Sequence, residues 1–487
     1  MNAPLRRVAV ACLVLFGLLL VNVNYRQVVK ADDYRDDDRN SRVLVRAYEK
    51  ERGSIALAGP NRPVIARSVE TDGRLRYLRT YPGGSLYAHV TGYYSLIYGQ
   101  DAVEERYDRV LSGEDPQLFV SRLSDQLTGR EARGGDVVLT VQQAAQQAAV
   151  EALGDQRGAV VALDPRSGAV LAMASSPTYD PTRLSSFDPA KIRAYWAALQ
   201  DDDAGNPLLN RAISQTYPPG STFKVITAAA ALEAGTAPDT RVPAPDELTL
   251  PQTTTPLRNF GGGRCDDGRT QTLADALRES CNTAFAQLGL DLGEEALREK
   301  ARAFGFEDEG LTLSERVAPS SIPAGLDPPS LAQSAIGQRD VRTTPLQMAM
   351  VAAGVANDGT VMLPHLVREV QAPDLTRLSV AQPEVYREAV SPEVAEQLTT
   401  MMELVVTDGS AVAAQIPGVR VAGKTGTAQN RPGADPHAWF IGFAPAEDPQ
   451  VALAVIVENG GSFGSEATGG AVAAPIGRSV MRAVLGR

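Results

Sequence analysis

The longest apolar run in the chain lies close to its start, over residues 8–23. Arg6 and Arg7 precede this run, and Asn24 and Tyr25 follow it. With these flanks the run is long enough for a membrane-spanning helix, which needs about 17–25 residues. Because the two arginines lie on its short N-terminal side, we predict a single-pass anchor in the plasma membrane with a cytoplasmic N-terminus. The rest of the chain then lies outside the cytoplasm.

A cleaved signal peptide is the alternative interpretation of the same run. Its candidate cleavage site, Val29-Lys30-Ala31, lies far from the end of the apolar residues. We therefore favour an uncleaved signal anchor and assign residues 1–25 to the cytoplasmic tip and the membrane helix.

Beyond the anchor, the pattern of polar and apolar positions changes twice. Residues 26–50 are charged and predict a stalk or a helix that leaves the membrane, and residues 51–135 alternate short apolar runs with Gly and Pro turns. The second pattern is typical of a β-rich domain. From residue 136 to 487, helical runs lie between two strand-rich ends. We predict an α+β protein with a non-catalytic domain over 26–135 and a catalytic domain over 136–487.

Periodicity also predicts individual elements in the catalytic domain. Strands are expected over residues 137–141, 159–163, 169–174, 438–443 and 451–457, and helices over 142–153, from about 221 to 232, and over 475–485.

Composition narrows the function classes. The chain has 487 residues, of which 44% are hydrophobic and 22% charged, which is ordinary for globular domains. A net charge of −11 argues against nucleic acid as a partner. Three histidines and three cysteines, widely scattered, are too few for a metal site. We expect neither a metal nor a cofactor.

A serine and a lysine three residues apart form the first candidate for chemistry. Ser221 and Lys224 follow Pro218-Pro219-Gly220, which cannot lie inside a helix, so a helix should begin close to Ser221. Residues i and i+3 share one helix face, which places the lysine amine against the serine hydroxyl. A desolvated, partly neutral lysine could take the serine proton and activate the hydroxyl as a nucleophile.

Two further clusters follow along the chain. Ser280-Cys281-Asn282 lies within residues 273–286, and Lys424-Thr425-Gly426-Thr427 follows a strand-like segment. Ser-x-x-Lys, then Ser-x-Asn, then Lys-Thr-Gly, in this order, is the signature of penicillin-binding proteins and serine β-lactamases. Each pattern is short and weak alone, but three in order are hard to obtain by chance.

The resemblance extends over nearly the whole chain. Residues 158–174 resemble the opening hairpin of a transpeptidase domain, and Trp439–Pro445 resembles the strand after Lys-Thr-Gly. Upstream, Arg52-Gly53-Ser54-Ile55 and residues 81–92 resemble the non-catalytic domain of class B penicillin-binding proteins. The chain is most similar to the actinobacterial penicillin-binding protein A type. The resemblance implies an antiparallel sheet packed against helices.

The resemblance also implies a reaction. Members of this family are peptidoglycan D,D-transpeptidases that act on stem peptides ending in D-Ala-D-Ala. Ser221 is then expected to attack the carbonyl between the two D-alanines while Lys224 takes its proton. Ser280 is expected to relay a proton to the leaving amine, and Asn282 to hold the acyl side chain. An amine of a neighbouring stem peptide would resolve the acyl-enzyme and form the cross-link in growth or division.

The third motif is expected to bind the substrate's carboxylate. Lys424 should lower the cost of a neutral Lys224 and attract that carboxylate, and Thr425 and Thr427 should offer it their hydroxyls. Gly426 has no side chain, which would allow the substrate backbone to come close. The family's oxyanion hole uses backbone N–H groups, here expected from Ser221 and Thr427.

A D,D-carboxypeptidase or a β-lactamase, in which water replaces the amine, is the alternative enzyme. A fast β-lactamase needs a base for deacylation, and the nearest acidic candidate, Asp246-Glu247, does not match such a motif well. We therefore expect β-lactams to act as inhibitors through a long-lived acyl-enzyme. A receptor or scaffold is less favoured, because only about seven residues precede the anchor.

No glycosyltransferase signature is visible upstream of the catalytic motifs. Glycan polymerisation would then need another protein. By resemblance, this partner is a multispanning membrane glycan polymerase that contacts the anchor and the upstream domain.

Two cysteines lie on the predicted outer side of the membrane, where disulfides persist. A bridge between Cys265 and Cys281 would tie the glycine-rich loop 259–264 to the Ser-Cys-Asn turn. We favour this bridge, with two free thiols as the alternative.

Overall fold

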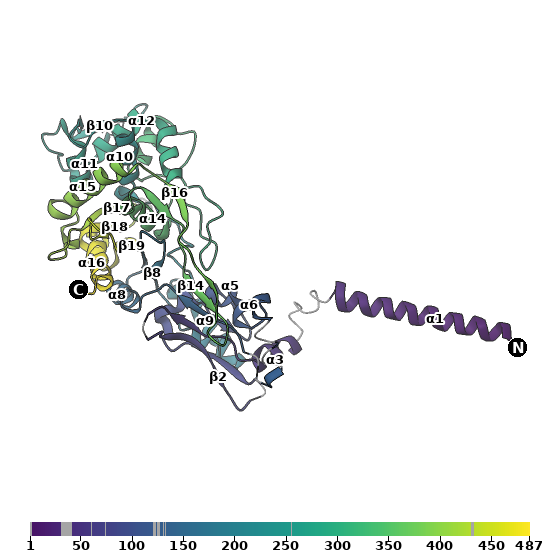
Figure 1. Cartoon of the computed structure of the whole chain (residues 1–487). Coiled ribbons are helices and arrows are strands. Elements are labelled where there is room, and N and C mark those ends of the chain that lie inside the picture. The colour runs from purple at the N-terminus through teal and green to yellow at the C-terminus, as the bar shows by residue number, and fades with distance from the viewer. Residues whose placement is uncertain are drawn as a thin grey trace.

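The structure is a computed structural model with an N-terminal helix and a two-part body (Figure 1). It describes residues 2–30, 41–59, 61–73, 75–119, 123, 127–129, 131, 133–254, 256–429 and 433–487.

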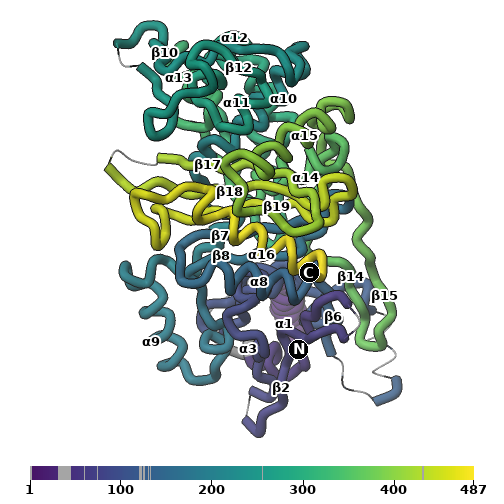
Figure 2. Tube along the Cα trace, turned by 90° about the vertical axis from the view of Figure 1, so that its left-hand side faces the viewer, coloured from purple at the N-terminus to yellow at the C-terminus, as the bar shows by residue number. Residues whose placement is uncertain are grey.

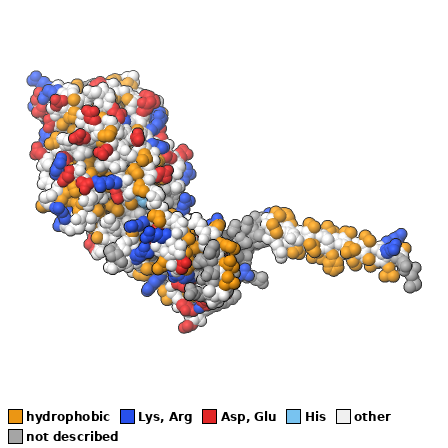
Figure 3. All heavy atoms as spheres, in the orientation of Figure 1, with side chains coloured by type: hydrophobic (Ala, Val, Ile, Leu, Met, Phe, Trp, Pro, Cys, Tyr) orange, Lys and Arg blue, Asp and Glu red, His pale blue; other side chains and the backbone are white. Residues whose placement is uncertain are grey.

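The N-terminal helix projects away from the body. Helix α1 (Asn2–Asn24) continues into the short π-helical segment η1 (Tyr25–Val29). Apolar side chains cover its visible surface (Figure 3), and they are exposed. Within the described residues, Ala3–Val29 is the one helix long and apolar enough to cross a membrane. Helix α3 (Ser41–Glu49) lies in the predicted stalk. Residues 31–40 of that stalk lie outside the described part of the chain.

A six-stranded sheet forms the part of the body near α3. Its order is β15-β14-β6-β1-β2-β3. The strands are β1 (Ile55–Leu57), β2 (Val64–Glu70), β3 (Tyr77–Thr80), β6 (Asp136–Leu139), β14 (Val367–Gln371) and β15 (Arg377–Val380).

The hairpin β14–β15 was not expected in this sheet. It returns from the second half of the chain, and β14 pairs antiparallel with β6. Figure 2 shows this hairpin running down beside the N-terminal strands. The sheet therefore crosses the boundary that the sequence placed at residue 136. Pairing between strands more than 200 residues apart leaves no local periodicity, so the sequence pattern could not predict it.

Buried charges are paired inside the N-terminal part. Glu104 accepts hydrogen bonds from Arg52 Nε at 2.7 Å and from Arg79 Nε at 2.6 Å. All three side chains are buried. Burial alone would raise the pKa of Glu104, but the two guanidinium groups hold it below its usual value. Removing Glu104 would leave the buried guanidinium of Arg79 without its carboxylate partner, which is strongly destabilising.

A five-stranded antiparallel sheet is the centre of the second part. Its order is β17-β18-β19-β7-β8. The predicted strands near residues 159, 169, 438 and 451 are confirmed. The bounds are β7 (Gly158–Leu163), β8 (Val170–Ser176), β17 (Ala422–Ala428), β18 (His437–Ala444) and β19 (Val451–Val457).

Helices cover both faces of this sheet. Helices α8 (Gln143–Leu153) and α16 (Ala474–Val484) pack together on one side, and the apolar helix α14 (Pro345–Ala356) packs against β7 and β19 from the other (Figures 1 and 2). Strands buried on both faces read as continuous apolar runs, as in Val451–Val457. The predicted helices 142–153 and 475–485 are confirmed.

A mainly helical region lies beyond β17, at the top of Figure 1. It contains α10 (Lys224–Glu233), α11 (Leu273–Glu279), α12 (Asn282–Ala303), α13 (Pro328–Ser334), α15 (Pro392–Asp408) and the short strands β9 (Arg241–Pro243), β10 (Glu247–Thr249), β11 (Pro256–Arg258) and β12 (Thr270–Thr272). The strand pair β13 (Thr360–Met362) and β16 (Val385–Glu388) borders it. Other α-helices and strands of the described residues are α4 (Ala88–Thr91), β4 (Tyr94–Ser95), β5 (Gly99–Gln100), α5 (Ala102–Arg106), α6 (Asp108–Leu111) and α9 (Pro189–Leu199).

Candidate active site

The serine and the lysine of the first motif lie at the start of a buried helix. Ser221 is in the 3-10 turn η6 (Gly220–Phe223), and Lys224 is the first residue of α10. Gly220 has a positive φ of 53°, which suits a residue without a side chain. Its N–H donates to the carbonyl of Gly337 at 2.9 Å. The turn leaves Ser221 half-buried, whereas Lys224 is fully buried.

The amine of Lys224 points at the second motif. Lys224 Nζ donates to the carbonyl oxygen of Ser280 at 2.7 Å and to Asn282 Oδ1 at 2.8 Å. The hydroxyl Oγ of Ser280 lies 3.3 Å from the same nitrogen. The structure therefore brings together residues that are 56 and 58 positions apart in the sequence.

These contacts define what a neutral Lys224 can do. A neutral amine has two N–H donors and one lone pair, and the Ser280 carbonyl and Asn282 Oδ1 are acceptors only. If they take both donors, the lone pair remains to accept a proton. Burial and the nearby charge of Lys424 hold the pKa of Lys224 well below its ordinary value. A buried lysine with this arrangement can serve as a base.

The Ser280–Asn282 turn joins two helices. Ser280 ends α11 in the left-handed conformation, with φ of 64°, and Asn282 begins α12. A non-glycine residue in this conformation is uncommon and is held by the structure around it. The reversal turns the Ser280 carbonyl and the Asn282 side chain toward α10.

Lys424 of the third motif lies on β17 and is fully buried. Its amine donates to the carbonyl of Thr425 at 3.1 Å. Burial lowers its pKa to about 7. The charge of Lys424 is also a cause of the lowered pKa of Lys224, so the two amines disfavour each other's protonation.

The two threonines of the third motif have partners in the fold. Thr425 Oγ1 lies 2.5 Å from the hydroxyl of Ser410, which follows α15. Thr427 Oγ1 accepts from the N–H of Gly469 at 3.5 Å. Thr425 is buried and Thr427 half-buried, so the hydroxyl of Thr427 is the more accessible.

Gly426 is required by the packing of the fold. A Cβ at this position would lie 2.8 Å from the carbonyl oxygen of Pro219 and 3.1 Å from Thr222 Cγ2. The loop that carries Ser221 therefore packs directly against β17 at Gly426. This contact already excludes a side chain at position 426, whether or not a substrate also approaches there.

A disulfide joins Cys265 to Cys281 in the structure. The Cα atoms are 6.0 Å apart, within the usual range for a bridge. Because Cys281 is the middle residue of the Ser280–Asn282 turn, the bridge links this turn to the loop after β11.

Several residues that contact the segment before Ser221 lie outside the three motifs. Trp439 Nε1 donates to the carbonyl of Pro218 at 3.0 Å, and Glu458 accepts from Tyr217 at 2.7 Å and from Arg211 Nε at 2.9 Å. These bonds hold the segment before Ser221, but their partners lie more than 200 residues away. The sequence of Trp439–Pro445 predicts a strand, but it does not indicate that the indole N–H of Trp439 bonds to Pro218.

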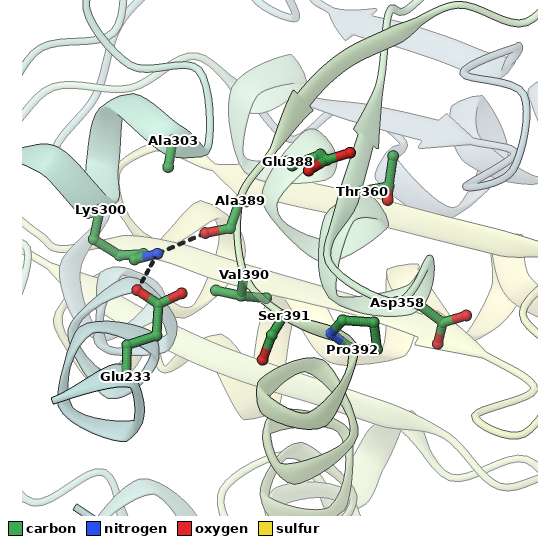
Figure 4. Close-up of a pocket in the computed structure, with 10 residues that line it drawn as sticks. All are labelled: Glu233, Lys300, Ala303, Asp358, Thr360, Glu388, Ala389, Val390, Ser391 and Pro392. Carbon is green, nitrogen blue, oxygen red and sulfur yellow. Dashed lines mark hydrogen bonds and ion pairs between the residues drawn. The ribbon is translucent and has the colours of Figure 1, made fainter. Parts of the chain in front are cut away.

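A cavity of about 450 Å³ opens at the other end of α10. Glu233, which ends α10, forms an ion pair of 2.5 Å with Lys300, whose amine also donates to the carbonyl of Ala389 (Figure 4). Asp358 and Glu388 also line the cavity. Nine residues of helix, or about 13 Å, separate Lys224 from Glu233. The cavity is therefore separate from the three motifs.

Comparison with known proteins identifies the family. Residues 158–482 match the penicillin binding protein transpeptidase domain, and residues 52–137 match the penicillin binding protein A dimerisation domain. The chain belongs to the penicillin-binding proteins that carry a transpeptidase domain.

Similar proteins are known from mycobacteria. The chain is 50% identical to a peptidoglycan D,D-transpeptidase PbpA of Mycolicibacterium smegmatis, over 100% of this chain and 99% of that protein. It is 48% identical to the Mycobacterium tuberculosis protein of the same name, with the same coverage. Penicillin-binding protein A from M. tuberculosis, as its penicillin G acyl-enzyme, matches with a TM-score of 0.85 and 47% identity over 90% of this chain and 100% of that one. Its imipenem acyl-enzyme matches with a TM-score of 0.86 over the same shares.

Proposed function

We propose that Ser221 of this peptidoglycan D,D-transpeptidase forms the serine acyl-enzyme and is acylated by penicillins. The observation that carries the proposal is the buried amine of Lys224. It faces Ser280 and Asn282 from the helix that begins three residues after Ser221. The family and the acyl-enzymes of the M. tuberculosis relative support the same chemistry.

The first half-reaction is acylation. Ser221 Oγ bonds to the carbonyl carbon between the two D-alanines while neutral Lys224 takes the hydroxyl proton. The C–N bond then breaks, and the proton passes through Ser280 to the nitrogen of the leaving D-Ala. A positioned base contributes about 10²–10⁴-fold in rate. The Ser280 hydroxyl, 3.3 Å from Lys224 Nζ, is within reach of a proton relay in the substrate complex.

The second half-reaction transfers the acyl group. An amine of a neighbouring stem peptide attacks the ester carbonyl and gives its proton to Lys224. The ester bond to Ser221 breaks, and Lys224 passes this proton to Ser221 Oγ. Asn282 holds the acyl side chain through its amide. The product is the cross-link, and the serine hydroxyl is restored.

Backbone N–H groups of Ser221 and Thr427 form the oxyanion hole in this proposal. The two segments are in close contact, because a Cβ at Gly220 would lie 2.9 Å from the carbonyl of Thr427. Removing one oxyanion donor typically costs about 10²–10³ in rate. Lys424, Thr425 and Thr427 take the carboxylate of the terminal D-Ala, the lysine by charge and the threonines by hydrogen bonds.

The two acidic candidates for activating a water, Asp246 and Glu247, both form ion pairs. Asp246 pairs with Arg264 at 3.1 Å, and Glu247 pairs with Arg258 at 2.7 Å. In this proposal neither carboxylate activates a water, and the acyl-enzyme is hydrolysed slowly.

Residues 1–25 anchor the protein in this proposal, with the N-terminus in the cytoplasm. Residues 26–135 form the pedestal, and residues 136–487 form the catalytic domain. A multispanning glycan polymerase supplies the glycan strands and contacts the anchor and the pedestal. Copurification from membranes tests this partner, and normal growth of cells with an exchanged anchor would count against the anchor contact.

Intact mass tests the central claim. The full-length protein in detergent is incubated with penicillin, and its mass is followed over hours. A stable adduct that maps to Ser221 is the expected result. An adduct that disappears within seconds would favour the hydrolytic alternative, and the absence of an adduct on a folded protein would contradict the acyl-enzyme.

A further inference from the structure

One side chain outside the three motifs reaches into the second motif. Asn259 lies between β11 and the 3-10 turn Phe260–Gly262, and it is 8% exposed. Its Oδ1 accepts from the backbone N–H of Asn282 at 2.8 Å and from that of Thr283 at 3.1 Å.

These bonds cap helix α12 from another segment of the chain. The first N–H groups of a helix have no partner inside the helix, and a side chain at the N-cap usually supplies one. Cys281 occupies the N-cap position here but makes no side-chain cap bond, and its sulfur is in the disulfide. Asn259 therefore takes the place of the missing cap.

The segment also fixes the side chain of Asn282. Asn282 Nδ2 donates to the carbonyl of Arg258 at 3.2 Å, while its Oδ1 accepts from Lys224 Nζ at 2.8 Å. Because the Arg258 carbonyl can only accept, it faces Nδ2 of Asn282, and this orientation turns Oδ1 toward Lys224 Nζ. Residues 258 and 259 thus hold both the backbone and the side chain of Asn282.

We propose that Asn259 is a positioning residue for acylation, which holds the Ser280–Asn282 turn so that its two acceptors take the N–H groups of Lys224. This inference rests on the proposed transpeptidase function. Asn259 acts through Asn282 and touches neither the nucleophile nor the base. If the turn moved, the amine would lose the acceptors that leave its lone pair free for the serine proton.

The neutrality of Asn259 matters as much as its shape. Aspartate has almost the same shape and could accept both cap bonds. In the described structure Asn259 Nδ2 is buried and makes no hydrogen bond, so the change to aspartate removes no donor bond. It adds a negative charge beside the turn that holds Lys224, and a nearby negative charge favours the ammonium form.

Two N–H groups at the start of α12 would hold this carboxylate, and the nearby charged side chains have other partners. The charged group that faces Lys224 is Lys424 on β17, while α12 presents the Asn282 amide and, at 5.5 Å, the ring of Phe285. The arginines on either side of Asn259 already have carboxylate partners in Glu247 and Asp246.

Acylation kinetics of the full-length protein in detergent test the proposal. The noncovalent binding constant and the acylation rate constant for penicillin G are measured separately against pH for wild type, Asn259→Ala and Asn259→Asp. Asn259→Ala is expected to lower the rate constant by about 10- to 100-fold, because small misplacements near reacting groups cost this much. The binding constant should change little.

Asn259→Asp is expected to separate positioning from folding. It should restore the melting temperature and the rate at high pH, while the rising limb of the pH profile moves upward by about 1 unit. The matched control is Ser391→Ala, which removes the cap bond to the N–H of Val394 on α15, away from the motifs. It should lower the melting temperature and leave the pH profile and the rate constant unchanged.

The outcomes separate this inference from the proposed function. If wild type gives no adduct at Ser221, the transpeptidase proposal itself fails. If wild type reacts and Asn259→Ala keeps the wild-type rate constant, the positioning role is wrong. The positioning role would also be wrong if Ser391→Ala lost as much of the rate as Asn259→Ala. It would be wrong as well if a folded Asn259→Asp kept the pH profile of the wild type.

Discussion

The backbone of Gly337 packs against the carbonyl oxygen of Gly220, the residue before the candidate nucleophile. A Cβ built on Gly337 would lie closer to that oxygen than van der Waals contact permits, and 2.7 Å from the Cβ of Phe223. The N–H of Gly220 donates to the carbonyl of Gly337 at 2.9 Å. The position of Ser221 therefore depends on a glycine more than 100 residues further along the chain.

Gly337→Ala should displace the nucleophile loop and slow acylation by about 100-fold. Gly325→Ala is the matched control, because both glycines have a φ of 69° and the space around Gly325 is open. Both variants pay about 1–2 kcal/mol for the left-handed backbone. Acylation rates and urea unfolding distinguish them. Equal rates in the two variants would show that the contact with Gly220 does not position Ser221.

Ser221→Ala should abolish the penicillin adduct, and Lys224→Ala should reduce acylation by about 10²–10⁴-fold, the contribution of a positioned base. The alanine at 224 also leaves two acceptors on residues 280 and 282 without their donor, so the melting temperature should fall while the fold persists. Circular dichroism and intact mass check both effects. A folded Lys224→Ala that is acylated at the wild-type rate would show that another group is the base.

The three motifs could be found from the sequence because each holds its residues within four positions. Local spacing predicted that Lys224 would lie beside the nucleophile. It did not predict that the amine would point at Ser280 and Asn282, which depends on how α10 packs against the α11–α12 turn.

Partners distant along the chain could not be predicted. Asn259 reaches Asn282 across 23 residues, and Trp439 reaches Pro218 across 221, with no periodic or motif signal at either end. The β14–β15 hairpin joins the N-terminal sheet for the same reason. Tertiary packing decides which distant side chains and strands pair. The local pattern of the sequence does not reveal these pairings.

Removing the Cys265–Cys281 bridge should destabilise the catalytic region and loosen the Ser280–Asn282 turn. The closed loop spans 16 residues, which corresponds to about 3 kcal/mol in the chain-entropy model. We expect the double variant Cys265→Ser/Cys281→Ser to lose about this much free energy of unfolding and to acylate more slowly. Urea unfolding and acylation kinetics measure the two effects. Wild-type stability in the double variant would mean that the bridge does not restrain the unfolded chain.

Stability should depend on pH through Lys424. Its pKa is about 7 in the folded protein, whereas a lysine in an unfolded chain has a pKa of about 10.4. Between these values the unfolded chain binds more protons than the folded one, so the free energy of unfolding rises with pH. The contribution is complete above the unfolded pKa and is lost as the pH falls through the window to about 7. Lys224, whose pKa is also lowered, acts in the same direction.

Lys424→Met tests this contribution, because it keeps an unbranched side chain and removes both the titrating amine and its effect on the pKa of Lys224. Wild type should gain stability with pH faster than the variant, by a difference approaching about 1.4 kcal/mol per pH unit for one proton. Urea unfolding between pH 7.5 and about 9.5 measures it, below the range in which buried tyrosines such as Tyr81, with raised pKa values, oppose the trend. Parallel curves for the two proteins would show that Lys424 keeps its proton in the folded protein over this pH range.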